Sequence, residues 1–206
     1  MSANVVVVRA QTGNVASVAK ALTHVGAAVN LTDDPKVIRS AEKLVWPGQA
    51  SFASLPALKQ KGIVDAVLEQ ISTGTPYLGI CLGMQSLFDT STEAPEAEGL
   101  GVISGTVSRF SWAEKHRKVP HMGWNTATKT GNDPLLKGVD DNAHFYFVHS
   151  YFASPTDPAS VALSCNYGVS FAAAVRKNNV FACQFHPEKS QKPGLQILEN
   201  FTRSNG

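Results

Sequence analysis

The chain has 206 residues, of which 43% are hydrophobic and 17% are charged, the size and composition of a globular protein with a core of its own. Its formal net charge is only +2, which excludes the strong positive field with which proteins bind nucleic acids or anionic membranes. The first residues contain neither a basic stretch nor a long apolar run, so we expect no signal peptide and no membrane span.

The cysteine content also limits the class of protein. Cys81, Cys165 and Cys183 form an odd set without the spacing of a zinc site or of a disulfide framework. We therefore expect no metal and no disulfide, and no motif in the sequence indicates a cofactor. The same observation favours a reducing compartment, the cytoplasm.

Strand and helix patterns alternate through the first half of the chain. Short apolar, β-branched runs predict strands, and apolar side chains spaced three and four residues apart predict helices. Strands are expected at residues 5–8, 27–31, 43–46 and 77–80. Helices are expected at residues 15–25 with Asn14 as cap, at 35–40, at 58–72, and after Cys81 as far as residue 88. This order predicts an α/β fold with an open, doubly wound, mostly parallel sheet.

The second half of the sequence has a different texture. Residues 90–98 are polar and acidic, which predicts a surface loop. From residue 99 onward, short segments rich in Val, Phe and Tyr alternate with turns, which predicts mainly antiparallel strands. They are expected at residues 106–110, 145–148, 161–165, 171–175 and 180–185, before a closing helix at 194–201. We therefore expect one domain, residues 1–206, in which an antiparallel C-terminal part extends the parallel sheet.

A candidate nucleophile lies where an apolar strand gives way to a helix. Cys81 is flanked by Gly79 and Gly83 in a G-x-C-x-G pattern. In a nucleophile elbow this turn exposes the reactive side chain, and the glycines leave room where the backbone folds back. The positive end of the following helix favours the thiolate, which is the reactive form. A buried structural cysteine beside two turn glycines is the alternative.

A candidate base follows the last predicted strand. His186 and Glu188 are separated only by Pro187. The histidine can accept the thiol proton, and the carboxylate can hold the ring in one tautomer, as in catalytic triads on unrelated folds. Alone, this tripeptide is most often a solvated turn. Together with the cysteine elbow it favours a Cys-His-Glu triad.

Four stretches of the chain resemble class I glutamine amidotransferases, which release ammonia from glutamine. Residues 79–85, with the elbow, and residues 184–190 (Gln-Phe-His-Pro-Glu-Lys-Ser) are similar to the motifs of the superfamily. Residues 119–125 (Val-Pro-His-Met-Gly-Trp-Asn) and 146–151 (Tyr-Phe-Val-His-Ser-Tyr) resemble the glutaminase-subunit family of the imidazole glycerol phosphate synthases, in histidine biosynthesis. The resemblance spans nearly the whole chain.

The resemblance implies a mechanism. Cys81 would attack the glutamine carboxamide to form a glutamyl thioester, His186 would move the protons, and Glu188 would orient His186. The oxyanion hole would consist of the backbone amide of Leu82 and one from the turn Gly48-Gln49. At this turn the chain departs from the family, because it has Gln49-Ala50 where a valine-glycine pair is commoner.

The resemblance also implies substrate and partner contacts. Gln85 and Glu93 match positions that hold glutamine, with Tyr146 and Ser150 behind them, although an exposed loop position is an alternative for Glu93. The implied partner is a cyclase subunit of the (β/α)₈ barrel type, which uses the ammonia to make imidazole glycerol phosphate and AICAR within a heterodimer. The expected partner interface, next to the basic run 115–118, consists of Pro120, His121, Gly123, Trp124, Asn125 and Lys189. A buried core position is the alternative for Trp124.

Three other functions remain open from the sequence. An amidotransferase domain of another class I synthase, for anthranilate, aminobenzoate or guanylate, would not combine the segments 119–125 and 146–151. A stand-alone cysteine hydrolase would not need Trp124 beside a basic segment. A catalytically weak regulatory relative would have no chemical need for the complete triad, although Gln49-Ala50 keeps this alternative open.

Overall fold

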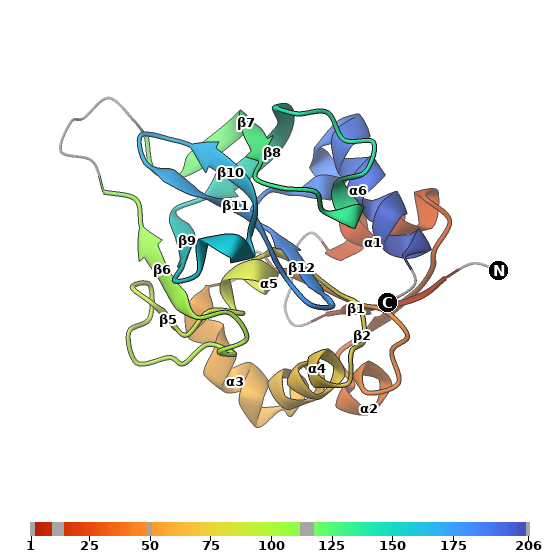
Figure 1. Cartoon of the computed structure of the whole chain (residues 1–206). Coiled ribbons are helices and arrows are strands. Elements are labelled where there is room, and N and C mark those ends of the chain that lie inside the picture. The colour runs from red at the N-terminus through yellow and green to blue at the C-terminus, as the bar shows by residue number, and fades with distance from the viewer. Residues whose placement is uncertain (1–2, 10–14, 49–50, 112–117, 205–206) are drawn as a thin grey trace.

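The computed structural model describes residues 3–9, 15–48, 51–111 and 118–204. Helices pack on both sides of a large twisted sheet, and a smaller sheet lies beside it (Figure 1). The strands are β1 (Asn4–Val8), β2 (Ala28–Thr32), β3 (Leu44–Gly48), β4 (Tyr77–Cys81), β5 (Thr90–Ser91), β6 (Gly105–Arg109), β7 (His121–Lys129), β8 (Ala143–His149), β9 (Tyr151–Pro155), β10 (Val161–Asn166), β11 (Ser170–Lys177) and β12 (Val180–Cys183). The α-helices are α1 (Val15–His24), α2 (Pro35–Ile38), α3 (Leu55–Gln60), α4 (Ile63–Ser72), α5 (Leu82–Gln85) and α6 (Gln191–Arg203). Short 3₁₀ turns are η1 (Phe52–Ser54), η2 (Pro134–Leu136), η3 (Pro158–Ser160) and η4 (Pro187–Lys189).

The large sheet has the strand order β2-β1-β3-β4-β12-β11-β10-β7-β8 within the described residues. Neighbours from β2 to β12 are parallel, and neighbours from β12 to β8 are antiparallel. The chain turns back next to β1, since β2 lies on one side of it and β3 on the other, as in doubly wound folds. The predicted parallel sheet with an antiparallel C-terminal extension is thereby confirmed, and the extension makes half of the neighbouring strand pairs antiparallel.

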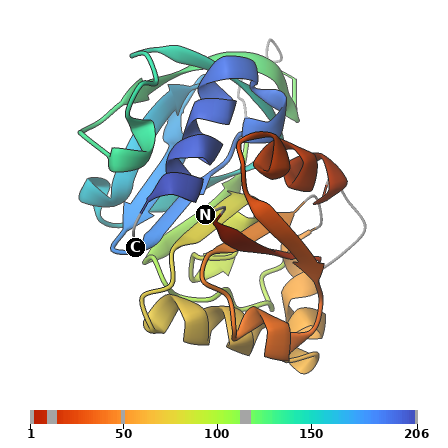
Figure 2. The same ribbon diagram turned by 90° about the vertical axis from the view of Figure 1, so that its right-hand side faces the viewer.

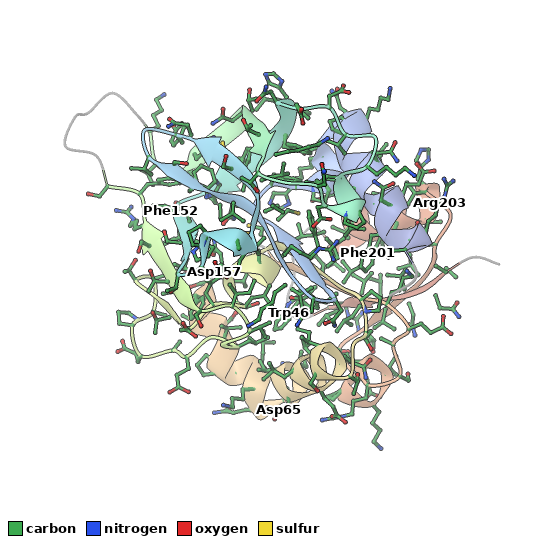
Figure 3. The ribbon with its side chains drawn as sticks, in the orientation of Figure 1. Trp46, Asp65, Phe152, Asp157, Phe201 and Arg203 are labelled. Carbon is green, nitrogen blue, oxygen red and sulfur yellow. The ribbon has the colours of Figure 1, made fainter. Side chains whose placement is uncertain are left out.

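The apolar run of β1 explains why both faces of this sheet are covered. Val5 and Val7 belong to one buried cluster together with side chains of α1 and α6, whereas Val6 and Val8 belong to a second cluster with side chains of α2, α3 and α4. Successive side chains of a strand point to opposite faces, so an uninterrupted apolar run fits a strand between two layers of helices. Figure 2 shows these two layers on opposite sides of the sheet. Trp46 of β3 is fully buried in the second cluster (Figure 3).

Several helix bounds differ from the predictions. The pattern over residues 58–72 predicts one helix, but the structure has two, α3 and α4, which meet at Gly62 with φ 72°. A left-handed glycine ends a helix without disturbing the apolar spacing, so periodicity alone does not register the break. The helix after Cys81 ends at Gln85 rather than at residue 88. The closing helix α6 is longer than the predicted 194–201.

Three strands, β5, β7 and β9, are absent from the predictions, and β5 lies in the segment 90–98, for which a surface loop is expected. Residues 121–129 form β7, which pairs with β10 and β8, although the sequence indicates only a docking segment there. One face of β7 is largely exposed, so its sequence lacks the apolar alternation that predicts a strand. Strand β9 follows β8 almost directly and belongs to the small sheet β5-β6-β9.

Some predictions concern residues that lie outside those described by the structure. They concern Asn14, the pair Gln49-Ala50 and all of the basic run 115–118 except Lys118. Among the helices that are described, none combines the length and apolar character needed to cross a bilayer. The residues that the structure describes, in helices or elsewhere, contain no group of three or more His, Cys, Asp or Glu side chains arranged to hold a metal ion.

Candidate active site

The candidate site forms where neighbouring parallel strands end. Gly48, the last residue of β3, is in register with Cys81, the last residue of β4. On the other side of β4, Cys183 of β12 is in register with Ile80. The chain therefore leaves β12 next to Cys81, and His186 follows within three residues. Because parallel strands end at one edge of a sheet, their register brings together groups that are far apart in the sequence.

Cys81 occupies a strained turn. Its backbone has φ 55° and ψ −105°, a region that residues other than glycine rarely adopt. A Cβ atom at Gly79 would collide with the carbonyl group of Gly83, and a Cβ atom at Gly83 would collide with the carbonyl oxygen of Trp46. Both positions therefore require glycine because backbones approach closely. This is the strand-to-helix geometry of the predicted nucleophile elbow.

His186 and Glu188 form a buried pair. Nδ1 of His186 lies 2.8 Å from Oε1 of Glu188, and the two side chains are 2% and 0% exposed. Nε2 of His186 makes no hydrogen bond of ordinary geometry to another described residue, but the Cys81 side chain lies near enough to interact with the ring, and both residues line the pocket described below. Burial lowers the pKa of His186, but hydrogen bonding and negative charge from Cys81 and Glu188 outweigh it and raise the pKa to about 10. The imidazole is therefore protonated at neutral pH and can give a proton to a leaving group.

A pocket of about 380 Å³ opens beside the cysteine, the volume of a site for one small molecule. It is lined by Cys81, Gln85, Glu93, Tyr146, Val148, His149, Ser150, Tyr151, His186 and Lys189. The structure thus places all four residues predicted to hold the substrate in the wall of one pocket, together with two members of the predicted triad. Glu188 is not part of the wall, but it is bonded to His186, which is.

Two polar residues of the pocket are fixed by hydrogen bonds. Nε2 of Gln85 donates to the carbonyl oxygen of Tyr151 at 3.1 Å and to Oε1 of Gln184 at 2.9 Å. Both amide hydrogens of Gln85 are thereby engaged, and its Oε1 can accept a hydrogen bond from a ligand. Glu93 accepts a hydrogen bond from the backbone N–H of Phe52 at 2.8 Å. These contacts hold acceptor oxygens at the pocket, as an ammonium group would require.

The predicted oxyanion donors lie on adjacent elements. A Cβ atom added to Gly48 would lie 2.6 Å from the Cβ atom of Leu82, so the end of β3 touches the start of α5. The backbone amide of Leu82 belongs to the first residue of α5, directly after Cys81. Gln49 lies outside the described residues, so its contribution to the oxyanion hole remains a prediction.

Part of the predicted partner surface is exposed. Trp124 is 47% exposed and Met122, which the sequence analysis does not single out, is 64% exposed. The Trp124 ring meets the edge of Tyr146, and Nζ of Lys189 lies 5.8 Å from the centroid of the same tyrosine ring. Pro120 is also exposed, whereas Gly123 and Asn125 are partly buried. We call Pro120, Met122, Trp124 and Lys189 the docking face.

The structure does not place His121, which is expected at the partner interface, on the docking face. Its side chain is 3% exposed and stacks on Phe147 and Tyr167, with ring centroids 4.8 Å and 4.0 Å away. Successive side chains of β7 point to opposite faces, so His121 points inward when Met122 and Trp124 point outward. Burial lowers the pKa of His121 to about 4, and the ring supports the docking face from behind.

Three residues at the site are not among those expected from the sequence. His149 and Tyr151 line the pocket, and Nδ1 of His149 lies 2.7 Å from the carbonyl oxygen of Tyr151. Burial lowers the pKa of His149 to about 3. Gln184 is fully buried, and its Nε2 lies 3.5 Å from Sγ of Cys81. All three lie within segments 146–151 and 184–190, but their contacts cross between strands, which sequence spacing does not reveal.

The geometry of this site suits one kind of chemistry. A thiol held at an elbow beside a charged imidazole can attack a carbonyl carbon and carry the acyl group on sulfur. The molecule is thus built as a cysteine-dependent acyl-transfer enzyme. The sequence model of the family described as glutamine amidotransferase class I matches residues 6–204, and the chain belongs to this family.

Relatives of similar length show which branch of the glutamine amidotransferases the chain resembles. The imidazole glycerol phosphate synthase subunit HisH of Acinetobacter baylyi is 43% identical over 94% of this chain and 94% of its own. That of Geobacter sulfurreducens is 46% identical over 92% of this chain and 93% of its own. A second HisH subunit of Pseudomonas aeruginosa is 45% identical over 96% of this chain and 98% of its own. The resemblance to this family is confirmed.

Solved structures share the fold at much lower identity. The crystal structure of a glutamine amidotransferase superposes with a TM-score of 0.74 at 22% identity and covers 96% of this chain and 98% of the other. The structure of PurLQS from Thermotoga maritima gives a TM-score of 0.74 at 18% identity and covers 98% of both chains. At these identities the likeness is one of fold alone.

Proposed function

We infer that the chain is the glutaminase subunit of an imidazole glycerol phosphate synthase in histidine biosynthesis. The single observation that carries this inference is the near-complete match to HisH subunits at 43% to 46% identity. The pocket supports it, because a nucleophilic thiol and acceptor oxygens that suit an amino-acid ammonium line the same cavity. The three cysteines of the chain are free thiols, in keeping with a reducing compartment, the cytoplasm.

In the first half of the reaction, Sγ of Cys81 attacks the carboxamide carbon of glutamine and a C–S bond forms. The carbonyl oxygen gains negative charge, which the backbone amide of Leu82 and one from the turn after Gly48 are placed to stabilise. The C–N bond then breaks, and His186 gives its Nε2 proton to the departing nitrogen, which leaves as ammonia. Glu188 keeps the imidazole oriented through Nδ1.

In the second half, water attacks the glutamyl thioester. His186, now neutral, takes a proton from the water as its oxygen bonds to the acyl carbon. The C–S bond breaks, the electron pair returns to sulfur, and glutamate leaves. Gln85 and Glu93 supply acceptors for the substrate ammonium, with Tyr146 and Ser150 beside them in the wall of the pocket.

The HisH subunits are, by name, parts of a synthase, which supports a partner subunit for this chain. We propose that the partner is a cyclase of the (β/α)₈ barrel type and that it contacts the docking face. An exposed tryptophan beside an exposed methionine is typical of a protein–protein interface. A closed interface would also carry ammonia across without its protonation in water.

The test is glutamine hydrolysis by the purified chain, alone and with the candidate cyclase and its nucleotide substrate. We expect little glutamate from the chain alone, a rise on addition of the partner and its substrate, and none from Cys81→Ser. Circular dichroism and partner binding should be unchanged in that variant.

Fast turnover without the partner would favour a stand-alone hydrolase instead. Turnover that survives Cys81→Ser would remove the nucleophile assignment. Activity with another class I synthase partner, and none with the cyclase, would contradict the assignment to histidine biosynthesis.

A further inference from the structure

The side chain of Gln184 contacts Sγ of Cys81, the reacting atom of the site, from outside the wall of the substrate pocket. Gln184 follows β12 and is fully buried, and its Nε2 donates to Sγ of Cys81 at 3.5 Å, an ordinary donor distance to a sulfur acceptor. It does not belong to the wall of the substrate pocket. Its contact is therefore with the nucleophile and not with a ligand in that pocket.

The orientation of the Gln184 amide is fixed by its other end. Oε1 of Gln184 accepts a hydrogen bond from Nε2 of Gln85 at 2.9 Å. Gln85 cannot turn its own amide around without losing this bond and its bond to the carbonyl oxygen of Tyr151. Because one end of the Gln184 amide must accept, the N–H end must face the sulfur.

Two buried histidines, His149 and His121, extend this network of hydrogen bonds beyond the carbonyl oxygen of Tyr151. The carbonyl oxygen of Tyr151 can only accept, so Nδ1 of His149 carries the proton, and Nε2 of His149 accepts from Nδ1 of His121 at 3.0 Å. Nε2 of His121 then accepts from Nδ2 of Asn125 at 3.2 Å. Each member has one possible role as donor or acceptor, and a network satisfied in this way is rigid.

We propose that Gln184 is a further catalytic residue, whose side-chain N–H stabilises negative charge on Sγ of Cys81. Gln85 acts on this contact as a positioning residue. The inference rests on the proposed function, since it assigns a role in the same thioester chemistry.

The side-chain N–H of Gln184 affects the reaction at the steps in which Sγ of Cys81 bears negative charge. Before acylation it stabilises the charged sulfur that attacks the carboxamide, because a hydrogen bond to a charged group favours the charged form. The charge disappears when the C–S bond forms. It returns when the thioester breaks and the electron pair goes back to sulfur, so the same N–H assists the departure of sulfur during hydrolysis.

A purely structural role does not account for the amide. The backbone N–H of Gln184 already donates to the carbonyl oxygen of Ala173, which continues the pairing of this segment whatever the side chain. Burying an amide is costly unless its polar atoms are paired. An apolar side chain would avoid that cost and fill the same space.

The test compares Gln184→Met with the intact chain and with Gln70→Met. Methionine keeps the length of the side chain and removes the donor. Gln70 is another buried glutamine, 7% exposed, which bonds to Arg39 and Thr75 and is not part of the site. The first readout is the rate of Cys81 alkylation by iodoacetamide at pH 7, followed by mass spectrometry of the Cys81 peptide without glutamine.

We expect alkylation of Cys81 to slow about tenfold in Gln184→Met, the effect of one hydrogen bond to a charged group. kcat for glutamine, measured with the partner present, should fall by about the same factor, with KM within about twofold. Gln70→Met should leave alkylation unchanged even if it lowers the stability.

Gln184→Glu provides a second test that does not depend on how methionine packs. The carboxylate keeps an acceptor for Gln85 and places an oxygen where the N–H was, so alkylation at pH 7 should slow at least as much. Alkylation within about twofold of the intact chain in both variants, with their circular dichroism unchanged, would overturn the role of Gln184. Absence of glutamine hydrolysis in the intact chain would count against the proposed function only, because the alkylation result stands without it.

Discussion

At the scale of single residues, His186 shows how burial and charge compete. Burial alone would favour the neutral imidazole, but Cys81 and Glu188 act in the opposite sense and raise its pKa to about 10. A protonated histidine beside a thiolate is the pair that acylation needs, because the leaving nitrogen must receive a proton. His186 should therefore keep its proton as the pH rises above neutral, where an ordinary histidine loses it. Acylation should not slow in that range for lack of this proton.

The pH profile of glutamine hydrolysis follows from this pKa. The raised pKa keeps the proton on His186 up to about pH 10, so loss of this proton should lower kcat only as the pH rises through 10, about tenfold per unit beyond it. Initial rates across this range, at saturating glutamine with the partner present, provide the measurement. A decline already centred near pH 6.5 would contradict the charged pair.

The sequence predicts a Cys-His-Glu triad but not the full set of contacts at the site. The spacing of His186 and Glu188 is local, so it could be interpreted directly, and the elbow glycines indicate a turn. The bond between Gln184 and Cys81 depends on β12 lying beside β4, a pairing between strands distant in the sequence. The inward orientation of His121 likewise depends on β7 being a strand, which its half-exposed sequence does not indicate.

At the scale of elements, the elbow depends on the close approach of β3, β4 and α5. A Cβ atom at Gly83 would overlap the carbonyl oxygen of Trp46, which is backbone and cannot move aside as a flexible side chain does. Gly83→Ala should therefore lower the free energy of unfolding by about 3 kcal/mol. Urea denaturation measures the loss.

The matched control for this substitution is Gly131→Ala. A Cβ atom there meets nothing within 4 Å, so the change should stay within about 0.5 kcal/mol. Equal effects of the two substitutions would mean that the elbow tolerates a side chain, and the assignment of its glycines to close backbone approach would fail.

The docking face is the second element-scale feature, because it combines the outer face of β7 with Lys189 from the turn η4. Trp124→Ala should weaken association with the cyclase about 10- to 100-fold, the effect of removing an aromatic anchor from an interface. Thermal unfolding should hardly change, since the ring is 47% exposed. Isothermal titration calorimetry with the intact chain and the variant measures the affinity.

Leu31→Ala is the corresponding control. Leu31 is 40% exposed on β2, which lies at the other edge of the large sheet from β7 and β8. The substitution removes a comparable exposed apolar side chain and should leave the affinity for the cyclase unchanged. Equal affinities for Trp124→Ala and the intact chain would place the partner on another surface.

At the scale of the whole molecule, the sheet could be predicted because its signals are long and repeated. Five parallel strands with apolar runs and intervening helices leave few arrangements that bury both faces. The small sheet β5-β6-β9 could not be predicted in this way, because residues 90–91, which pair with 106–107, belong to a polar segment that predicts a loop. It nevertheless brings the segment of Glu93 to the pocket.

The buried histidines link the stability of the whole molecule to pH. Burial lowers the pKa of His149 to about 3, below the value near 6.5 in an unfolded chain. The unfolded state therefore binds more protons between these values, and stability is complete above about pH 6.5 and is lost as the pH falls toward 3. This group should contribute roughly 2–4 kcal/mol of the loss between pH 7 and pH 4.

Comparison of the intact chain with His149→Gln isolates this contribution. Glutamine does not titrate, so the free energy of unfolding from urea denaturation should fall less between pH 7 and pH 4 in the variant than in the intact chain, whatever the loss at pH 7. His24→Gln on α1, away from the network, should keep the full pH dependence, because His24 is exposed in the folded chain. If all three proteins lost the same free energy over this range, proton uptake by His149 would not be a cause of acid unfolding.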